Sequence, residues 1–149
     1  MIIEESIAGR SLLARLDHGA EIIGQIADVA RERRIRAAAI STVGALTRAD
    51  LGFYDQTGQE YRVRAVEEPV EIASCTGNIS LLEGEPFVHA HAVLADSSGR
   101  VLAGHLVRGT IFAAELFVQE LAEANLHRAW DKQTGLKLWS DVQPQGVGH

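Results

Sequence analysis

The chain has 149 residues, of which 46% are hydrophobic, and a formal net charge of -6. This length and apolar content are typical of one compact domain with a hydrophobic core. The acidic balance disfavours broad electrostatic attraction to nucleic acid or to anionic membranes. No segment has the length and apolar character of a membrane span, and the stretch MIIEESIAGR lacks the pattern of a signal peptide.

Cysteine usage agrees with a reducing compartment. Cys75 is the single cysteine of the sequence, so no intramolecular disulfide can form. Its apolar neighbours favour a small core residue over a catalytic thiol. We therefore expect a cytoplasmic protein.

The first part of the chain predicts one strand followed by one helix. The strand covers residues 11–16 (SLLARL) and ends at Asp17, which can cap the helix that follows. From residue 20 to residue 34, apolar side chains recur at helical spacing, so one stripe of the helix can pack on a sheet. Glu21 suits the positive end of this helix.

Most of the remaining chain favours strands. The runs cover residues 37–43, 48–54, 59–66, 70–82, 86–95 and 100–107. Strands that follow one another through tight turns favour antiparallel pairing over repeated parallel crossovers. We therefore predict an α+β fold, with a mixed, mainly antiparallel sheet packed against one principal helix.

The C-terminal part is harder to assign. Residues 109–123 (GTIFAAELFVQELAE) fit a helix or a strand, and periodicity alone does not decide between them. Beyond residue 124 the composition turns polar, so we predict a compact domain over residues 1–124 and a tail over residues 125–149. Trp130 and Trp139 in this tail could pack on a neighbouring subunit or cover a groove on the same chain.

Three histidines form the most informative pattern of the sequence. His89 and His91 alternate along one predicted strand, and His105 lies in the next strand, beyond a short turn. A three-residue loop over 97–99, with Gly99 in the left-handed conformation, would place His91 opposite His105. His89 would then project to the same face. A loop of two or four residues would turn His105 to the other face.

Two interpretations of this cluster remain open. The histidines could be hydrogen-bonded residues of a sheet, with no metal bound. Imidazole is, however, the usual protein ligand of zinc, and three such ligands leave one coordination position for water or substrate. Because His89, His91 and His105 share one face of otherwise apolar strands, we favour a divalent metal site with zinc as the first candidate.

Several motifs are similar to those of the plants-and-prokaryotes conserved (PPC) domain. They are GxISxLxGxPFVHxHxxL at residues 77–94 and GHLxxGT at residues 104–110. An IxxxxAL pattern at residues 40–46 and the strand at residues 51–55 also match, so the resemblance extends over roughly residues 11–123. It implies a compact α+β domain that assembles as a homotrimer.

A wider resemblance concerns the histidines. The domain is similar in fold to zinc proteins such as acetolactate decarboxylase, whose His-x-His pair and third histidine match His89, His91 and His105. The implied function is a small-molecule-binding protein or a metal-dependent enzyme of unknown reaction. Glu85 could transfer a proton, and Arg108 could bind an anionic substrate. A solvated turn carboxylate and an exposed ion pair are the alternative roles of these two residues.

A DNA-associated regulatory or assembly protein is the alternative function. Plant members of the family carry AT-hooks, which enter the minor groove through an Arg-Gly-Arg-Pro core that this sequence lacks. Arg31, Arg33 and Arg34 could form a nucleic-acid patch, but they also complement the negative end of the predicted helix. The acidic net charge gives DNA binding no further support.

Overall fold

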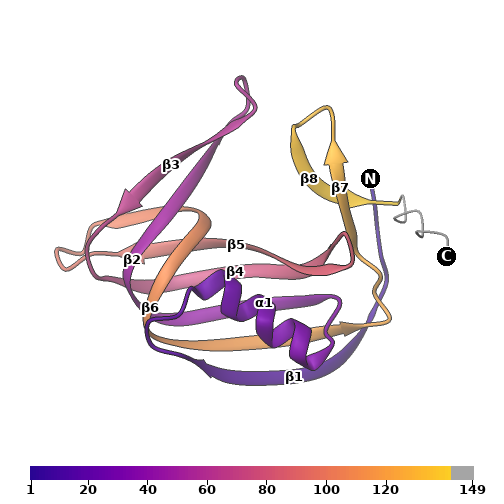
Figure 1. Ribbon diagram of the computed structural model, residues 1–149, viewed down its shortest axis with the longest axis horizontal. Coiled ribbons are helices and arrows are strands. Elements are labelled where there is room, and N and C mark those ends of the chain that lie inside the picture. Colours follow the sequence, from indigo (N-terminus) through magenta and orange to yellow (C-terminus); the bar gives the residue numbers. More distant parts are fainter. Residues whose placement is uncertain (142–149) are drawn as a thin grey trace.

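The computed structural model describes residues 1–141 and has the predicted α+β architecture, with one helix against a strongly bent sheet (Figure 1). In chain order the elements are β1 (Ile7–Leu16), α1 (Ile22–Arg33), β2 (Ala38–Asp55), β3 (Glu60–Val66), β4 (Val70–Leu82), β5 (Glu85–Ala95), β6 (Val101–Ala122), β7 (His127–Asp131) and β8 (Leu136–Ser140). At 12 residues, α1 is too short to cross a lipid bilayer.

The sheet is mixed and mainly antiparallel, as predicted. The order of its strands is β3-β2-β6-β5-β4-β7-β8, with β1 paired to β6. β2 also pairs with β4, so the ladder through β2, β6, β5 and β4 returns to its starting strand. β7 joins β4 through a short parallel pairing, whereas the other pairings between named strands are antiparallel.

The prediction of separate strands over residues 37–43 and 48–54 was wrong, because both belong to β2. Gly44 lies between them with a φ of 136°, where the pairing of β2 with β4 shifts register. A side chain at this position would overlap the carbonyl oxygen of Ala113. The glycine therefore bends the strand without ending it, as at a β-bulge.

Residues 109–123 fall almost entirely within β6, which resolves the ambiguity in favour of a strand. β6 also includes the predicted strand at residues 100–107, so the two runs form one element. Between Ala114 and Val118 its side chains alternate between buried and exposed. Its ladders with β1 on one edge and β2 on the other satisfy the backbone groups of this stretch.

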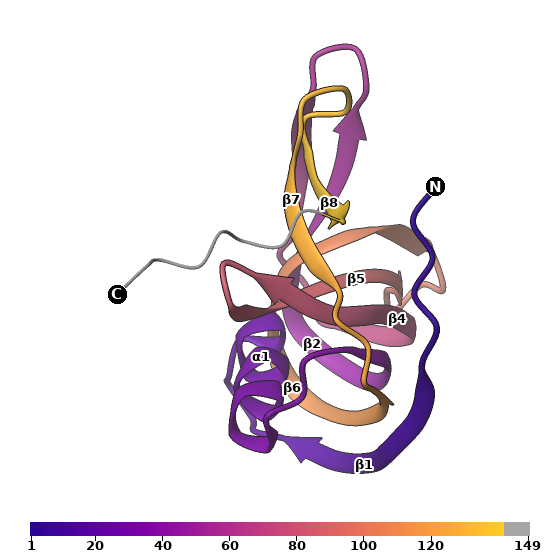
Figure 2. The same cartoon turned by 90° about the vertical axis from the view of Figure 1, so that its right-hand side faces the viewer.

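Helix α1 lies against the sheet (Figures 1 and 2), and its apolar stripe belongs to the main core. Ile22, Ile26 and Ala30 are fully buried in the main core. The expected cap at Asp17 was wrong: Glu21 is the N-cap, and its carboxylate accepts hydrogen bonds from the backbone N–H groups of residues 23 and 24. Asp17 instead accepts a hydrogen bond of 2.8 Å from the Gln25 side chain.

Two hairpins stand away from the body of the domain on the same side (Figures 1 and 2). One comprises β3 and the end of β2, and the other comprises β7 and β8. Hydrogen bonds join them, from the Tyr54 hydroxyl to the carbonyl of Thr134 at 2.5 Å and from the Gln59 amide to the carbonyl of Gln133 at 2.9 Å. The β7–β8 hairpin lies in the segment predicted as a tail, whose residues 142–149 are outside the described residues.

A methyl group at Gly77 is expected to destabilise the fold. Gly77 on β4 faces Ala90 on β5, and an added Cβ would overlap the carbonyl oxygen of His89 and lie 2.8 Å from Cα of Ala90. We expect Gly77→Ala to lower the free energy of unfolding by about 1–3 kcal/mol or more, measured by urea denaturation. Gly58→Ala is the control, because its Cβ would make ordinary contacts from 3.5 Å. Equal stability of the two variants would contradict this account.

Candidate metal centre

The β5–β6 hairpin has the predicted register. The backbone N–H of Asp96 donates to the carbonyl of Arg100 at 3.0 Å, which closes a three-residue loop. Gly99 in this loop has a φ of 81°, the left-handed conformation that the register requires. His91 consequently lies opposite His105 in the ladder. Sequence reasoning thus predicted both the turn and the pairing of these two histidines.

The three predicted histidines come together on one face of the sheet. Ring centroids are separated by 5.2 Å for His89 and His91, 5.2 Å for His89 and His105, and 5.5 Å for His91 and His105. One ligand nitrogen from each ring lies within 4.8 Å of the other two. The three residues could therefore bind a metal.

The environment favours the neutral imidazoles that metal binding needs. Burial, together with the positive charge of Arg128 and the neighbouring histidines, lowers the pKa of His89 to about 4. Burial is also the main cause that lowers the pKa of His105. Nδ1 of His105 is buried and accepts or donates no hydrogen bond among the described residues. The donor set and this unsatisfied nitrogen both fit a metal ion with imidazole ligands.

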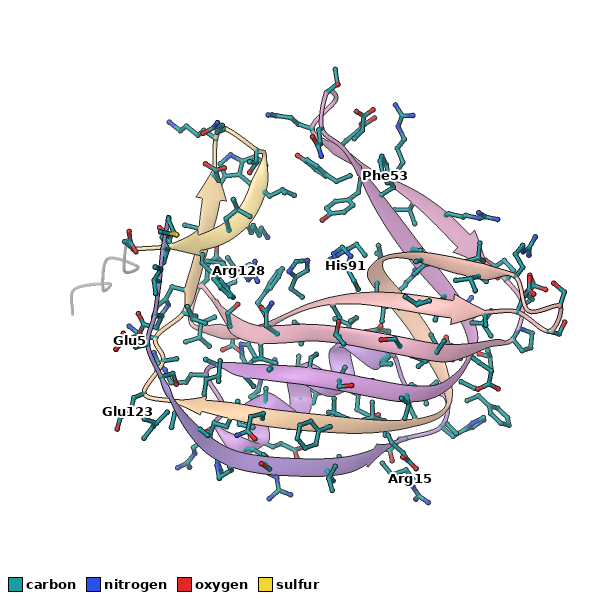
Figure 3. The ribbon with its side chains drawn as sticks, turned by 180° about the vertical axis from the view of Figure 1, so that it is seen from behind. Glu5, Arg15, Phe53, His91, Glu123 and Arg128 are labelled. Carbon is teal, nitrogen blue, oxygen red and sulfur yellow. The ribbon has the colours of Figure 1, made fainter. Side chains whose placement is uncertain are left out.

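A cavity of about 270 Å³ adjoins the histidines. It lies between the two projecting hairpins, where the side chains of His91 and Arg128 are seen in Figure 3. Its lining includes Tyr61 of β3, Phe87 of β5, His89 and His105, and Arg128 and Trp130 of β7. The β7–β8 hairpin, predicted as a tail, therefore forms one wall of the cavity.

Sequence reasoning missed Arg128, Tyr61 and Phe87 as residues beside the histidines. Phe87 could have been found, because it precedes His89 by two positions and so shares its strand face. Arg128 and Trp130 are likewise two positions apart and share one face of β7. This spacing does not indicate which part of the chain that face meets. For Trp130, the structure agrees with the alternative of covering a groove on the same chain.

The other candidate residues lie in ion pairs away from the cavity lining. Glu85 pairs with Arg31 at 3.2 Å, and Arg31 also pairs with Asp28 at 2.5 Å. Arg108 pairs with Asp50 at 2.5 Å. The contact of Arg108 matches the exposed ion pair weighed for it, whereas Glu85 is an exposed carboxylate that also forms an ion pair. Arg34 ends helix α1 in the left-handed conformation, and its backbone N–H satisfies the carbonyls of the last turn.

The fold and the site together define an α+β domain with a three-histidine cluster beside a small cavity. Residues 3–122 match the family model of the Plants and Prokaryotes Conserved (PCC) domain. The chain therefore belongs to this family, abbreviated PPC above. The match ends before β7 and β8, so the wall that contains Arg128 lies outside the family-matched residues.

Three solved structures are similar over nearly the whole chain. A metal-containing protein from Archaeoglobus fulgidus is 41% identical, with a TM-score of 0.91, over 95% of this chain and 100% of that one. A plant- and prokaryote-conserved protein from Pyrococcus horikoshii is 36% identical, with a TM-score of 0.90, over 97% and 100%. A protein of Bacteroides thetaiotaomicron, provisionally named DNA-binding, is 25% identical, with a TM-score of 0.82, over 93% and 96%.

Two further likenesses are more limited. The bifunctional protein GlmU of a Synechococcus strain is 30% identical over 133 residues, which are 87% of this chain and 20% of that protein. The chain thus spans about one fifth of the length of this curated relative. A Staphylococcus aureus protein similar to α-acetolactate decarboxylase is 11% identical, with a TM-score of 0.55, over 78% and 53% of the two chains. This last likeness concerns the fold alone.

Acid is expected to destabilise the metal-free protein partly through His89. Its pKa is about 4 in the folded state against 6.5 for the ordinary group, so between these values the unfolded chain binds more protons. Stability contributed by this group is present above pH 6.5 and is lost as the pH falls towards 4.

We expect His89→Gln to flatten the dependence of unfolding free energy on pH within this window, measured by urea denaturation of metal-free protein. Carboxylate titrations are common to both proteins and cancel in the comparison. Identical pH slopes for the wild type and the variant would contradict the burial of this imidazole.

Proposed function

We propose that the protein holds one divalent metal ion, with zinc as the first candidate, through His89, His91 and His105. The observation that carries this proposal is the convergence of three imidazole nitrogens within 4.8 Å of one another. Three imidazoles suit zinc and leave a fourth position for water or a ligand. An ion bound in this way could polarise a carbonyl group or lower the pKa of a bound water.

The adjoining cavity supports a small-molecule-binding protein or a metal-dependent enzyme. Its volume of about 270 Å³ is slightly below that of pockets for drug-sized ligands. His89 and His105 both line it, so a molecule within it would reach the open position of the ion. The Archaeoglobus fulgidus relative described as metal-containing supports the metal part of this proposal.

Metal analysis tests the proposal directly. We expect protein purified without an affinity tag, and then equilibrated with Zn²⁺ and dialysed, to retain about one ion per chain. His89→Ala and His105→Ala should each remove most of it, because two imidazoles hold zinc weakly. His18→Ala is the control, since His18 contacts Phe112 and is not one of the three clustered histidines. Wild-type protein that retains no ion would refute the site.

We propose a homotrimer as the assembled form, as the family resemblance implies. An exposed apolar patch on the sheet, made of Leu13, Val43 and Phe117, supports contact with another copy. Leu13 is 83% exposed and lies opposite Phe117 in the β1–β6 pairing. Apolar side chains grouped in this way are typical of a surface that is covered in an assembly.

Light scattering is expected to give three times the chain mass of 16.1 kDa. Phe117→Glu should shift the mass towards that of one chain, because it places a charge in the apolar patch. Val101→Glu, at an exposed position beside the β5–β6 turn, should leave the mass unchanged. A wild-type mass of one chain would refute the trimer.

A DNA-associated role has less support. The Bacteroides thetaiotaomicron relative, provisionally named DNA-binding, is one observation in its favour. Against it, Arg31 is engaged by Asp28 and Glu85, and the whole chain carries a net charge of -6. A phosphate backbone would have to displace these carboxylates. We therefore favour the metal-centred function.

We propose the cytoplasm as the location, because the single cysteine of the sequence carries a free thiol, which agrees with a reducing compartment. The free thiol of Cys75 is buried, and burial raises its pKa to about 11. Such a thiol is a poor nucleophile at neutral pH, which supports its interpretation as a core residue.

A further inference from the structure

Arg128 is a half-buried cation without an acidic partner among residues 1–141. Its guanidinium donates to Ser80 Oγ at 2.8 Å, to the carbonyl of Lys137 at 2.8 Å and to Asn78 Oδ1 at 2.9 Å. All three acceptors are neutral. Buried charges in proteins are usually paired with an opposite charge. The described part of the chain therefore orients this guanidinium without neutralising it.

The surroundings hold the Arg128 side chain in place. Its guanidinium carbon lies 5.0 Å from the ring centre of Phe87 and 5.8 Å from that of Trp139. Contacts of this kind favour a cation electrostatically and limit its motion. A guanidinium has five N–H donors, and the three hydrogen bonds leave two for another molecule. The group is thus positioned in advance and still able to donate.

The cavity next to Arg128 is electropositive. Its described lining contains two cations, Arg128 and Lys137, beside the neutral imidazoles of His89 and His105, and no carboxylate. The positive charge of Arg128 is also one of the causes that lower the pKa of His89 and His105, so its field reaches the histidines. A divalent ion there would add two further positive charges. A negatively charged molecule would complement this cavity.

The other walls of the cavity are aromatic and apolar. Tyr61, Phe87 and Trp130 line it together with Leu136 and Leu138. Flat rings of this kind pack well on a planar unsaturated body. Apolar and aromatic walls beside Arg128 and Lys137 suit a carboxylate carried on an apolar body better than a free phosphate, which has no apolar part to pack on these walls.

We propose that this cavity binds a small aromatic carboxylate, whose carboxylate group is held by Arg128 and whose ring packs against Phe87 and Tyr61. This inference rests on the proposed function, because it assigns the ligand class of the metal-centred site. It extends that function to the β7–β8 hairpin, which lies beyond the family-matched residues. The cavity volume of about 270 Å³ restricts the ligand to a small molecule.

Benzoate is the probe, and uncharged benzamide is its matched control of nearly the same shape. We expect calorimetry on the zinc-equilibrated wild-type protein to show benzoate binding about tenfold or more tightly than benzamide, because only benzoate forms a charge-assisted hydrogen bond. Equal affinities would overturn the proposal without any variant. Inorganic phosphate that binds as tightly as benzoate would also overturn it, in favour of a general anion site.

Variants of Arg128 then test whether its guanidinium holds the carboxylate. We expect Arg128→Gln to weaken benzoate binding about tenfold or more while the metal content stays at that of the wild type. Arg128→Lys should restore part of the affinity, because it returns the charge but not the planar group. The control is Arg15→Gln on β1, which lies far from the cavity (Figure 3) and should bind benzoate normally.

Metal analysis separates failure of this inference from failure of the proposed function. Wild-type protein that retains zinc but binds benzoate no better than benzamide refutes the ligand class and leaves the metal site intact. Wild-type protein that retains no zinc refutes the metal site, and preferential benzoate binding to it through Arg128 would still support the carboxylate site.

Discussion

The register of the β5–β6 hairpin is the constraint on which the site depends. Side chains of a strand alternate between two faces, so a shift of one residue would turn His105 away from His89 and His91. The carboxylate of Asp96 accepts hydrogen bonds from the backbone of Ser98 and Arg100 at 2.9 and 3.0 Å, which stabilises the turn. A short turn at the far end of the hairpin therefore decides whether three imidazoles share one face.

Close approach of backbones positions the rest of the site. Gly77 lets β4 pack directly against the stretch of β5 that includes His89, and Gly44 lets the long strand β2 bend without ending. Because β2 continues past this bend, its far end projects with β3 as one of the two hairpins (Figure 1). The strand pairings that form the core thus also place a wall beside the histidines.

Burial lowers the pKa of His89, His105 and Arg128 alike, but the groups end in different charge states. It favours the neutral form of His89 and His105, which is the form that binds a metal. Arg128 is also buried in part, but a guanidinium keeps its charge in proteins. The cavity therefore combines neutral ligands with the permanent positive charge of Arg128. That combination is suited to a metal cation and an organic anion bound side by side.

The sequence by itself determined the α+β class, the amphipathic helix and the pairing of His91 with His105, because each depends on local periodicity or on one turn. Local sequence patterns could not assign residues 109–123 to a helix or a strand. These residues form a strand because β1 and β2, which are distant in the sequence, pair with its two edges. Only the tertiary structure brought Arg128 beside the histidines. The alternation in β7 defines its two faces. The parallel pairing with β4, and the hydrogen bonds of the β7–β8 turn with Tyr54 of β2 and with Gln59 in the β2–β3 turn, decide which face meets the cavity.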